Sequence, residues 1–226
     1  MNNPVFIIIP CYNEAAIIRQ TVNSLLDLSY TVVVIDDAST DSTQQVLSGL
    51  SVFYIRHPIN LGQGAALQTG IDFALKKGAT YIVSFDADGQ HDAKDIKEMV
   101  DILMDGKADI VFGSRFLPGA SSDSSGFRKF LLHAGRYINY IFTGILLSDA
   151  HNGFRAMNRK AAGSILLKEN RMTHASEFLL EVKRNQLKFA ESPVHIRYTT
   201  YSKRKGQSLF NSIRIFFDLV LNKIFE

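Results

Sequence analysis

Two aspartates one residue apart, Asp86 and Asp88, directly follow the apolar run Tyr81–Phe85. A short apolar run that ends in turn-forming residues predicts a buried strand. Because the chain leaves the alternating pleat where a strand ends, both carboxylates can reach one hard cation. Mg²⁺ and Mn²⁺ prefer oxygen ligands and neutralise charge on phosphate groups. We therefore predict a Mg²⁺ or Mn²⁺ site at these two aspartates, with Gln90 and His91 next in the chain to complete it.

Other polar residues follow the preceding predicted strands and suit a nucleotide. Tyr12 can stack on a base, and Glu14 can accept hydrogen bonds from it. Asp37 can accept from a base N–H or a ribose hydroxyl, although a carboxylate there can equally cap the following helix. Gly62 and Gly64 let the backbone approach an anion at a helix start.

Three arginines, Arg115, Arg155 and Arg204, stand where phosphate groups would need cations. For any one of them, a solvated surface charge is the ordinary alternative.

The single cysteine, Cys11, excludes an internal disulfide framework and fits a reducing compartment. No His/Asn constellation near it indicates a reactive thiol.

Hydrophobic periodicity predicts alternating strands and helices that would place these residues. The predicted strands are Val5–Ile9, Thr31–Ile35, Val52–Ile55, Tyr81–Phe85, Asp109–Phe112 and Val194–Tyr198. The predicted helices are Glu14–Leu28, Thr43–Leu50, Ala65–Lys77, Asp92–Met104, Phe127–Leu147 and His174–Asn185. Alternation of this kind indicates an α/β fold, a mostly parallel sheet with helices on both faces. Ligands bind beyond the carboxyl ends of such strands, where the polar clusters lie.

The chain of 226 residues, 46% of them apolar and 21% charged, has the composition of a globular protein. We expect one domain, residues 1–200, with two lobes at 1–113 and 114–200, followed by a tail at 201–226. The tail carries five basic and two acidic residues, whereas the rest carries 20 of each. A neutral body with a basic tail favours an anionic partner at that end and argues against nucleic acid.

The tail segment Leu209–Phe225 has apolar residues on one helical face and basic residues beside them. An amphipathic helix of this kind can lie in a membrane interface. It can equally pack on its own domain or on a second subunit of a homo-oligomer. No uninterrupted apolar run approaches the ~20 residues that a spanning helix needs.

Six ordered motifs across residues 4–160 together resemble those of the family 2 glycosyltransferases of GT-A fold. Within that family they are most similar to the dolichyl-phosphate mannose synthase-like branch. The motifs are Pro10-Cys11-Tyr12-Asn13-Glu14, Ile35 to Asp41, Asn60 to Ala65, Asp86 to His91, Gly113-Ser114-Arg115 and Gly153-Phe154-Arg155.

The resemblance implies an inverting transfer from a nucleoside-diphosphate sugar, with a GT-A, Rossmann-like fold. The nucleotide-sugar site would comprise Pro10, Tyr12, Glu14, Ile35, Asp37, Gly62, Gly64, Asp86, Ala87, Asp88 and Arg115. The metal ligands would be Asp86, Asp88 and Gln90, with Asp88, Arg115 and Arg155 acting in catalysis. The acceptor phosphate would be bound by Arg128, Lys129, Arg155 and Arg204.

The acceptor decides whether the reaction needs a base. A polyprenyl phosphate (dolichyl or undecaprenyl) is already anionic, so it needs none, and the enzyme would act in the cytoplasm at the inner face of the membrane. A sugar hydroxyl in polysaccharide assembly must lose a proton, for which Glu177 and His174 are the candidates. The same residues also fit the first turn of a helix. The third hypothesis is an inert subunit that only binds nucleotide sugar.

Overall fold

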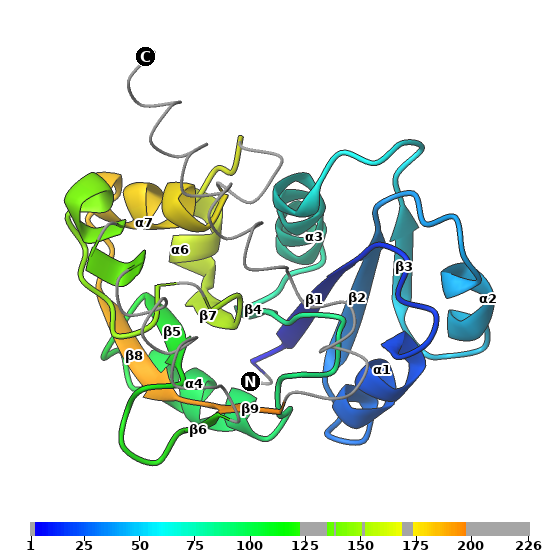
Figure 1. The fold of residues 1–226 in the computed structure, drawn as a ribbon, viewed down its shortest axis with the longest axis horizontal. Helices are drawn as coiled ribbons and strands as arrows, with labels where there is room; N and C mark the ends of the chain where they lie inside the picture. Colours follow the sequence, from blue (N-terminus) through cyan, green and yellow to red (C-terminus); the bar gives the residue numbers. More distant parts are fainter. Residues whose placement is uncertain (1–2, 123–134, 138, 151, 169–173, 198–226) are drawn as a thin grey trace.

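A seven-stranded sheet forms the centre of the protein and carries helices on both faces (Figure 1). The computed structural model describes residues 3–122, 135–137, 139–150, 152–168 and 174–197. Its strands are β1 (Val5–Cys11), β2 (Thr31–Asp36), β3 (Phe53–Arg56), β4 (Tyr81–Ser84), β5 (Ile110–Ser114), β6 (Ser121–Ser122), β7 (Arg155–Asn158), β8 (Phe189–Pro193) and β9 (His195–Ile196). Its helices are α1 (Ile18–Leu26), α2 (Thr43–Leu47), α3 (Gln63–Lys76), α4 (Asp95–Met104), α6 (Arg159–Ser164) and α7 (His174–Arg184).

The strand order is β3-β2-β1-β4-β7-β5-β8, with a separate pair of β6 and β9. Strands β3, β2, β1 and β4 pair in parallel, and so do β5 and β8. Among the described strands of this sheet, β7 alone runs antiparallel, between β4 and β5. The predicted mostly parallel sheet is therefore confirmed, and the carboxyl ends of β1, β2, β4 and β5 meet at one edge.

Each face of the sheet has its own hydrophobic core. Along β1, Ile8 packs into the core that contains residues of α3, α6 and α7. Its neighbours Ile7 and Ile9 pack into the core that contains residues of α1, α2 and α4. Because alternate residues of a strand point to opposite faces, a strand covered on both sides must be apolar throughout. This explains the continuous apolar runs of β1, β2 and β4.

Pro10 does not end β1, although the sequence analysis ended the strand at Ile9. The strand continues to Cys11, and Pro10 keeps its register opposite Ile35 of β2. On the other side, β4 pairs with β1 only as far as Ile8. Since Phe85 N donates to Ile8 O at 2.9 Å, the next residue facing that side is Pro10, where β4 has already ended. The missing N–H of proline therefore breaks no ladder bond.

Strand β7, helix α6 and strand β8 were not predicted. β7 is four residues long and begins with the charged Arg155, so it lacks an apolar signature. β8 contains Glu191 and Pro193, and it is the last strand of the sheet, where a proline facing the outer edge breaks no ladder bond. Both strands are identified only by their pairing with neighbouring strands in the structure, and not by a sequence pattern.

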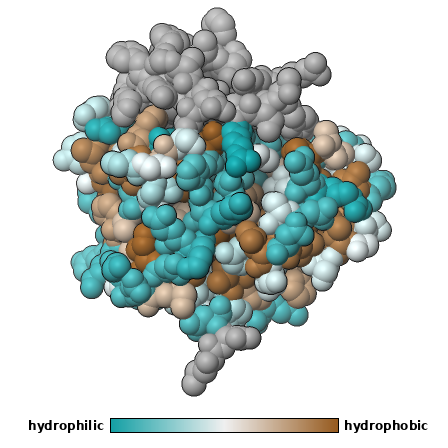
Figure 2. Space-filling view, turned by 90° about the horizontal axis from the view of Figure 1, so that it is seen from below, coloured by the Kyte–Doolittle hydropathy of each residue, from teal (hydrophilic) through white to brown (hydrophobic). Residues whose placement is uncertain are grey.

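The predicted helix Phe127–Leu147 is present in part. Residues 135–137 and 139–143 are helical, and the helix ends at Gly144, whose φ of 72° suits a glycine. The beginning of that segment and the whole predicted tail lie outside the described residues. None of the helices within the described ranges is long and apolar enough to cross a membrane. The coloured surface in Figure 2 shows polar and apolar side chains interspersed.

Candidate active site

The turn after β4 carries the two predicted metal ligands. Gln90 donates to Asp88 through both its backbone N, at 3.1 Å from Oδ1, and its side-chain Nε2. Gly89 has a φ of 71°, and the carbonyl of Ala87 accepts a hydrogen bond of 3.1 Å from Thr21 Oγ1 of α1. The turn is thus held by a hydrogen bond to α1 and by hydrogen bonds within the turn, and the latter fix the direction of the Asp88 side chain.

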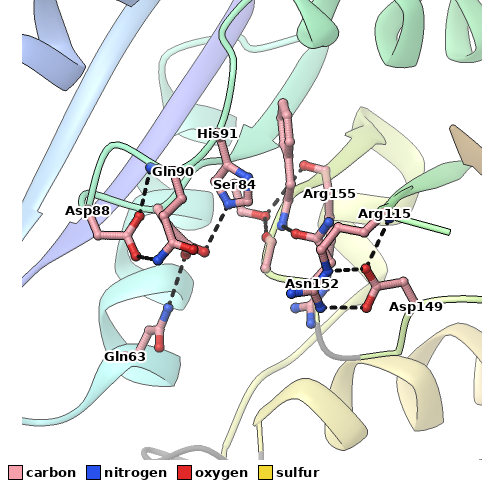
Figure 3. Close-up of polar contacts among 12 residues, drawn as sticks. Gln63, Ser84, Asp88, Gln90, His91, Arg115, Asp149, Asn152 and Arg155 are labelled. Atoms are coloured by element: carbon pink, nitrogen blue, oxygen red, sulfur yellow. Dashed lines mark hydrogen bonds and ion pairs between the residues drawn. The ribbon is translucent and has the colours of Figure 1, made fainter. Parts of the chain in front are cut away.

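Three different segments surround the carboxylate of Asp86. His91 Nε2 lies 2.9 Å from its Oδ2, and Gln63 Nε2, in the first turn of α3, lies 3.4 Å from its Oδ1 (Figure 3). Gly153 comes so close that a Cβ built there would lie 2.8 Å from Oδ2. Ser84 holds the Gly153 carbonyl with a 2.7 Å hydrogen bond. A side chain at position 153 would therefore push the carboxylate of Asp86 out of this position.

The electrostatics of the two aspartates suit a divalent cation. Burial raises the pKa of Asp88, and the neighbouring carboxylate of Asp86 raises it further. Two neighbouring carboxylates repel each other, and a bound divalent cation, which prefers oxygen ligands, would remove that repulsion. No group of three or more His, Cys, Asp or Glu in the described part of the chain could hold a metal ion. Gln90, donor oxygens and water would complete the shell, as is usual for Mg²⁺.

Arg155 is a buried cation at the carboxyl end of β4. The residue is 2% exposed, it pairs in register with Ser84, and its guanidinium lies 4.5 Å from the ring centroid of Phe178. Burial lowers the pKa of Arg155 to about 10, against an opposing effect of Asp86, so it stays charged at neutral pH. Its Nε and Nη1 have no hydrogen-bond partner among the residues that the structure describes. A buried cation with unused donors is suited to an anionic ligand.

Arg115 differs because a buried carboxylate already holds it. Its Nε and Nη2 lie 2.6 and 2.7 Å from the two oxygens of Asp149, in a bidentate pair (Figure 3). The side chains of Arg115 and Asp149 are 9% and 1% exposed. Its positive charge is therefore largely neutralised within the protein.

The predicted nucleoside residues gather at the carboxyl ends of β1 and β2. Pro10 and Ile35 are register partners there. Tyr12 follows with 44% of its surface exposed, whereas Glu14 is only 9% exposed. The structure thus brings an exposed aromatic ring and a carboxylate to the edge predicted from sequence. Beside them, burial raises the pKa of the Cys11 thiol, which makes a reactive thiolate unfavourable.

Asp37 has an internal role that the sequence did not indicate. It accepts hydrogen bonds from the backbone N of Leu61 at 2.9 Å and of Gly62 at 2.7 Å. His57 Nδ1 lies 2.8 Å from the same carboxylate, and His57 Nε2 lies 3.0 Å from Thr69 Oγ1 of α3. Asp37 therefore holds the loop that begins α3, where Gly62 has a φ of 98°. Gly64 follows, buried, in the first turn.

The predicted acceptor residues are only partly described. Glu177, in the first turn of α7, accepts a hydrogen bond of 2.8 Å from the backbone N of Lys168. Helix α7 begins at His174, as predicted. Arg128, Lys129 and Arg204 lie outside the described residues.

Sequence reasoning missed four residues that shape the site: Ser84, Asp149, His57 and Gly153. Ser84 occupies a strand position, and Asp149 and His57 stand alone in the sequence, so no spacing pattern pointed to them. Gly153 was part of a recognised motif, but its closeness to Asp86 depends on β7 pairing with β4. Each of these four residues contacts a site residue that is distant along the chain.

Comparisons with known proteins agree with this geometry. The family model "Glycosyl transferase family 2" matches residues 6–166. The UDP-N-acetylglucosamine–dolichyl-phosphate N-acetylglucosaminyltransferase of Methanococcus voltae is 30% identical over 241 residues, covering 97% of this chain and 96% of that protein. The dolichol-phosphate mannosyltransferase of Pyrococcus furiosus is 28% identical over 231 residues, covering 96% and 63%.

A solved structure supports the fold. Glucosyl-3-phosphoglycerate synthase from Mycobacterium tuberculosis, in complex with Mn²⁺, UDP-glucose and phosphoglyceric acid, aligns with a TM-score of 0.71 at 18% identity. The alignment covers 93% of this chain and 74% of that one. With the family model matched over most of its length, this chain belongs to the family 2 glycosyltransferases, in their dolichyl-phosphate mannose synthase-like branch.

Proposed function

We propose that this glycosyltransferase moves a hexose from a nucleoside-diphosphate sugar to a polyprenyl phosphate, with inversion at the anomeric carbon. The observation that carries the proposal is the arrangement of Asp86 and Asp88 at the end of β4, between the start of α3 and the buried cation Arg155. The relatives named for dolichyl-phosphate substrates support the acceptor class.

On the donor side, Asp86 and Asp88 would hold Mg²⁺ or Mn²⁺ together with the diphosphate. The bound cation would supply Lewis-acid stabilisation of the charge that develops on the leaving diphosphate. The first amides of α3 add the positive end of a helix dipole beside Asp86. Tyr12 would stack on the base at the ends of β1 and β2. As the acceptor oxygen bonds to the anomeric carbon, the bond to the diphosphate breaks, and direct attack from the opposite face inverts that carbon.

On the acceptor side, an anionic phosphate needs no base. Arg155 offers unused donors at the Asp86 end of the site, and Arg128, Lys129 and Arg204 are proposed to add positive charge. Glu177, the candidate base for a hydroxyl acceptor, accepts a hydrogen bond from Lys168 N through one oxygen, and a phosphate acceptor would not need it as a base. Glu177→Gln should therefore turn over polyprenyl phosphate at nearly the wild-type rate. A large loss with this acceptor would contradict it, and activity only on sugar hydroxyls would favour the polysaccharide alternative.

A membrane-bound acceptor requires the enzyme to reach the membrane surface. The helical residues 135–137 and 139–143 include the exposed side chains of Tyr137, Tyr140 and Ile141, the last with 76% of its surface accessible. Apolar and aromatic residues of this kind favour a membrane interface, so we propose that this segment and the basic tail bind the cytoplasmic leaflet peripherally. Liposome flotation tests the tail, because a chain ending at Tyr201 should bind anionic vesicles less than the full chain.

A donor screen tests the proposal most directly. UDP- and GDP-sugars, each with Mn²⁺, should raise the melting temperature of the full chain for the true donor and produce turnover on polyprenyl phosphate. NMR of the product should show the anomeric configuration opposite to that of the donor. Binding of a donor with no turnover on any acceptor would instead favour the inert subunit.

A further inference from the structure

The side chain of His91 is buried although the residue directly follows Gln90 and lies only three residues after Asp88. Its side chain is 3% exposed, whereas that of Asp86 is 33% exposed. The imidazole lies among Phe85, at 5.3 Å between centroids, and Phe154, at 4.7 Å. The two phenylalanine rings are themselves 5.3 Å apart in an edge-on arrangement. His91 therefore points into an aromatic cluster and away from the space that the donor would occupy.

The hydrogen bonds of His91 define its tautomer. Nε2 lies 2.9 Å from Asp86 Oδ2, while the buried Nδ1 has no hydrogen-bond partner in the described part of the chain. A neutral imidazole has one donor and one acceptor nitrogen. Because an unused buried donor costs more than an unused acceptor facing aromatic rings, the proton belongs on Nε2, where Asp86 accepts it.

The backbone around His91 is fixed as well. His91 forms an isolated antiparallel bridge with Ile196, and Arg197 N donates to Gln90 O at 2.9 Å. The ring cluster joins β4 to the Gly153–Arg155 segment, whose Gly153 abuts Asp86. The imidazole thus cannot turn without disturbing three segments.

We propose that His91 is a positioning residue that donates from Nε2 to Asp86 and so holds this carboxylate in the orientation needed to bind the divalent cation. His91 itself does not bind the metal, contrary to what its place after Gln90 suggested. The inference rests on the proposed metal role of Asp86. Outer hydrogen bonds to a metal ligand fix its orientation, and their loss typically costs about 10–100-fold in metal affinity.

Three variants of the full chain separate positioning from packing. His91→Leu keeps an apolar side chain in the aromatic cluster but removes the donor, whereas His91→Gln keeps an amide N–H that can reach Asp86. His195→Gln is the matched control. His195 also contacts an aspartate, with its Nδ1 2.8 Å from Asp95, but this aspartate is not a proposed metal ligand. Mn²⁺ affinity is measured by electron paramagnetic resonance with UDP present, and folding by circular dichroism.

We expect His91→Leu to fold and to bind Mn²⁺ about 10–100-fold more weakly. His91→Gln should recover most of the affinity, and His195→Gln should match the wild type. In the metal-free wild type, long-range ¹H–¹⁵N correlation should show the His91 proton on Nε2. A folded His91→Leu with wild-type Mn²⁺ affinity, or a proton on Nδ1 with none on Nε2, overturns the inference. If the wild type binds no Mn²⁺ even with UDP, the proposed metal role fails instead, and the tautomer still tests the Asp86 hydrogen bond.

Discussion

At the scale of single residues, the site depends on how buried charges are balanced. Arg115 is neutralised by Asp149, while Arg155 keeps unused donors in a buried position. Asp88 has a raised pKa beside Asp86. Buried charges without full compensation lower the free energy of unfolding. Such charges gathered at one end of the sheet therefore indicate a ligand site.

Removing the charge of Asp88 should stabilise the metal-free protein. Because the pKa of Asp88 is raised in the folded protein, the folded state binds this proton more tightly than the unfolded state does. The contribution of Asp88 to the free energy of unfolding is therefore favourable at low pH and is lost as the pH rises through the folded pKa. At pH 7 Asp88→Asn should therefore melt at or above the wild-type temperature without metal. Turnover should fall at least about 100-fold, because loss of an outer partner alone costs 10–100-fold.

Calorimetry with and without Mn²⁺ and UDP checks both parts of that prediction. The ligands should raise the melting temperature of the wild type and leave that of Asp88→Asn nearly unchanged. An equal rise in both proteins would show that Asp88 does not hold the cation.

Gly153→Ala tests the close approach to Asp86. Its Cβ would lie 2.8 Å from Oδ2 and 2.9 Å from Oδ1, so the carboxylate must move, and a displacement near 1 Å can cost about 100-fold in rate. In Gly163→Ala, the control in α6, the Cβ meets nothing within 4 Å. This control should keep its turnover and gain about 0.5–1 kcal/mol in the free energy of unfolding. Equal turnover in the two variants would contradict the close approach.

At the scale of elements, β7 decides how the site is assembled. It lies between β4 and β5 and carries Arg155 and the preceding Gly153 to Asp86. Sequence patterns located the flanking strands β4 and β5 but not β7, because four residues beginning with arginine carry no strand periodicity. The motif around Gly153 was recognisable from the sequence, whereas its place in the sheet was not.

The helical residues 135–137 and 139–143 should contribute to membrane binding. Tyr137→Ser with Ile141→Ser removes exposed apolar surface and should reduce flotation with anionic vesicles, with solution turnover on a short-chain acceptor retained. Leu28→Ser removes an apolar side chain that is 43% exposed beyond the end of α1 and should leave flotation unchanged. Equal flotation of all three proteins would exclude this segment as a membrane contact.

At the scale of the whole molecule, the two predicted lobes share one sheet. Residues 155–158 come from the second lobe but insert between β4 and β5 of the first. Met157 of β7 is fully buried in the core with Ile82 and Ile110. A cut at residue 113 would therefore separate strands that pair, so we expect the two lobes to unfold together.

Thermal unfolding should be a single transition, coincident in far- and near-ultraviolet circular dichroism. Met157→Ala should destabilise that transition as a whole by about 2–5 kcal/mol. Met104→Ala, at a position 54% exposed, should stay within about 0.5 kcal/mol of wild type. Two separate transitions, with only one affected by Met157→Ala, would show independent lobes.

The sequence by itself determined the α/β class, the parallel strands β1, β2 and β4, and the cluster of acidic and glycine residues at their ends. These follow from local signals, since strands buried on both faces read as apolar runs and turns have their own residue types. Only the tertiary structure decided which of the residues act on one another. Asp37 holds the α3 loop and Asp149 neutralises Arg115, because these contacts join segments that are brought together by strand pairing and not by spacing along the chain. His91 contacts Asp86 within a single turn, but its ring is placed there by packing against Phe85 and Phe154.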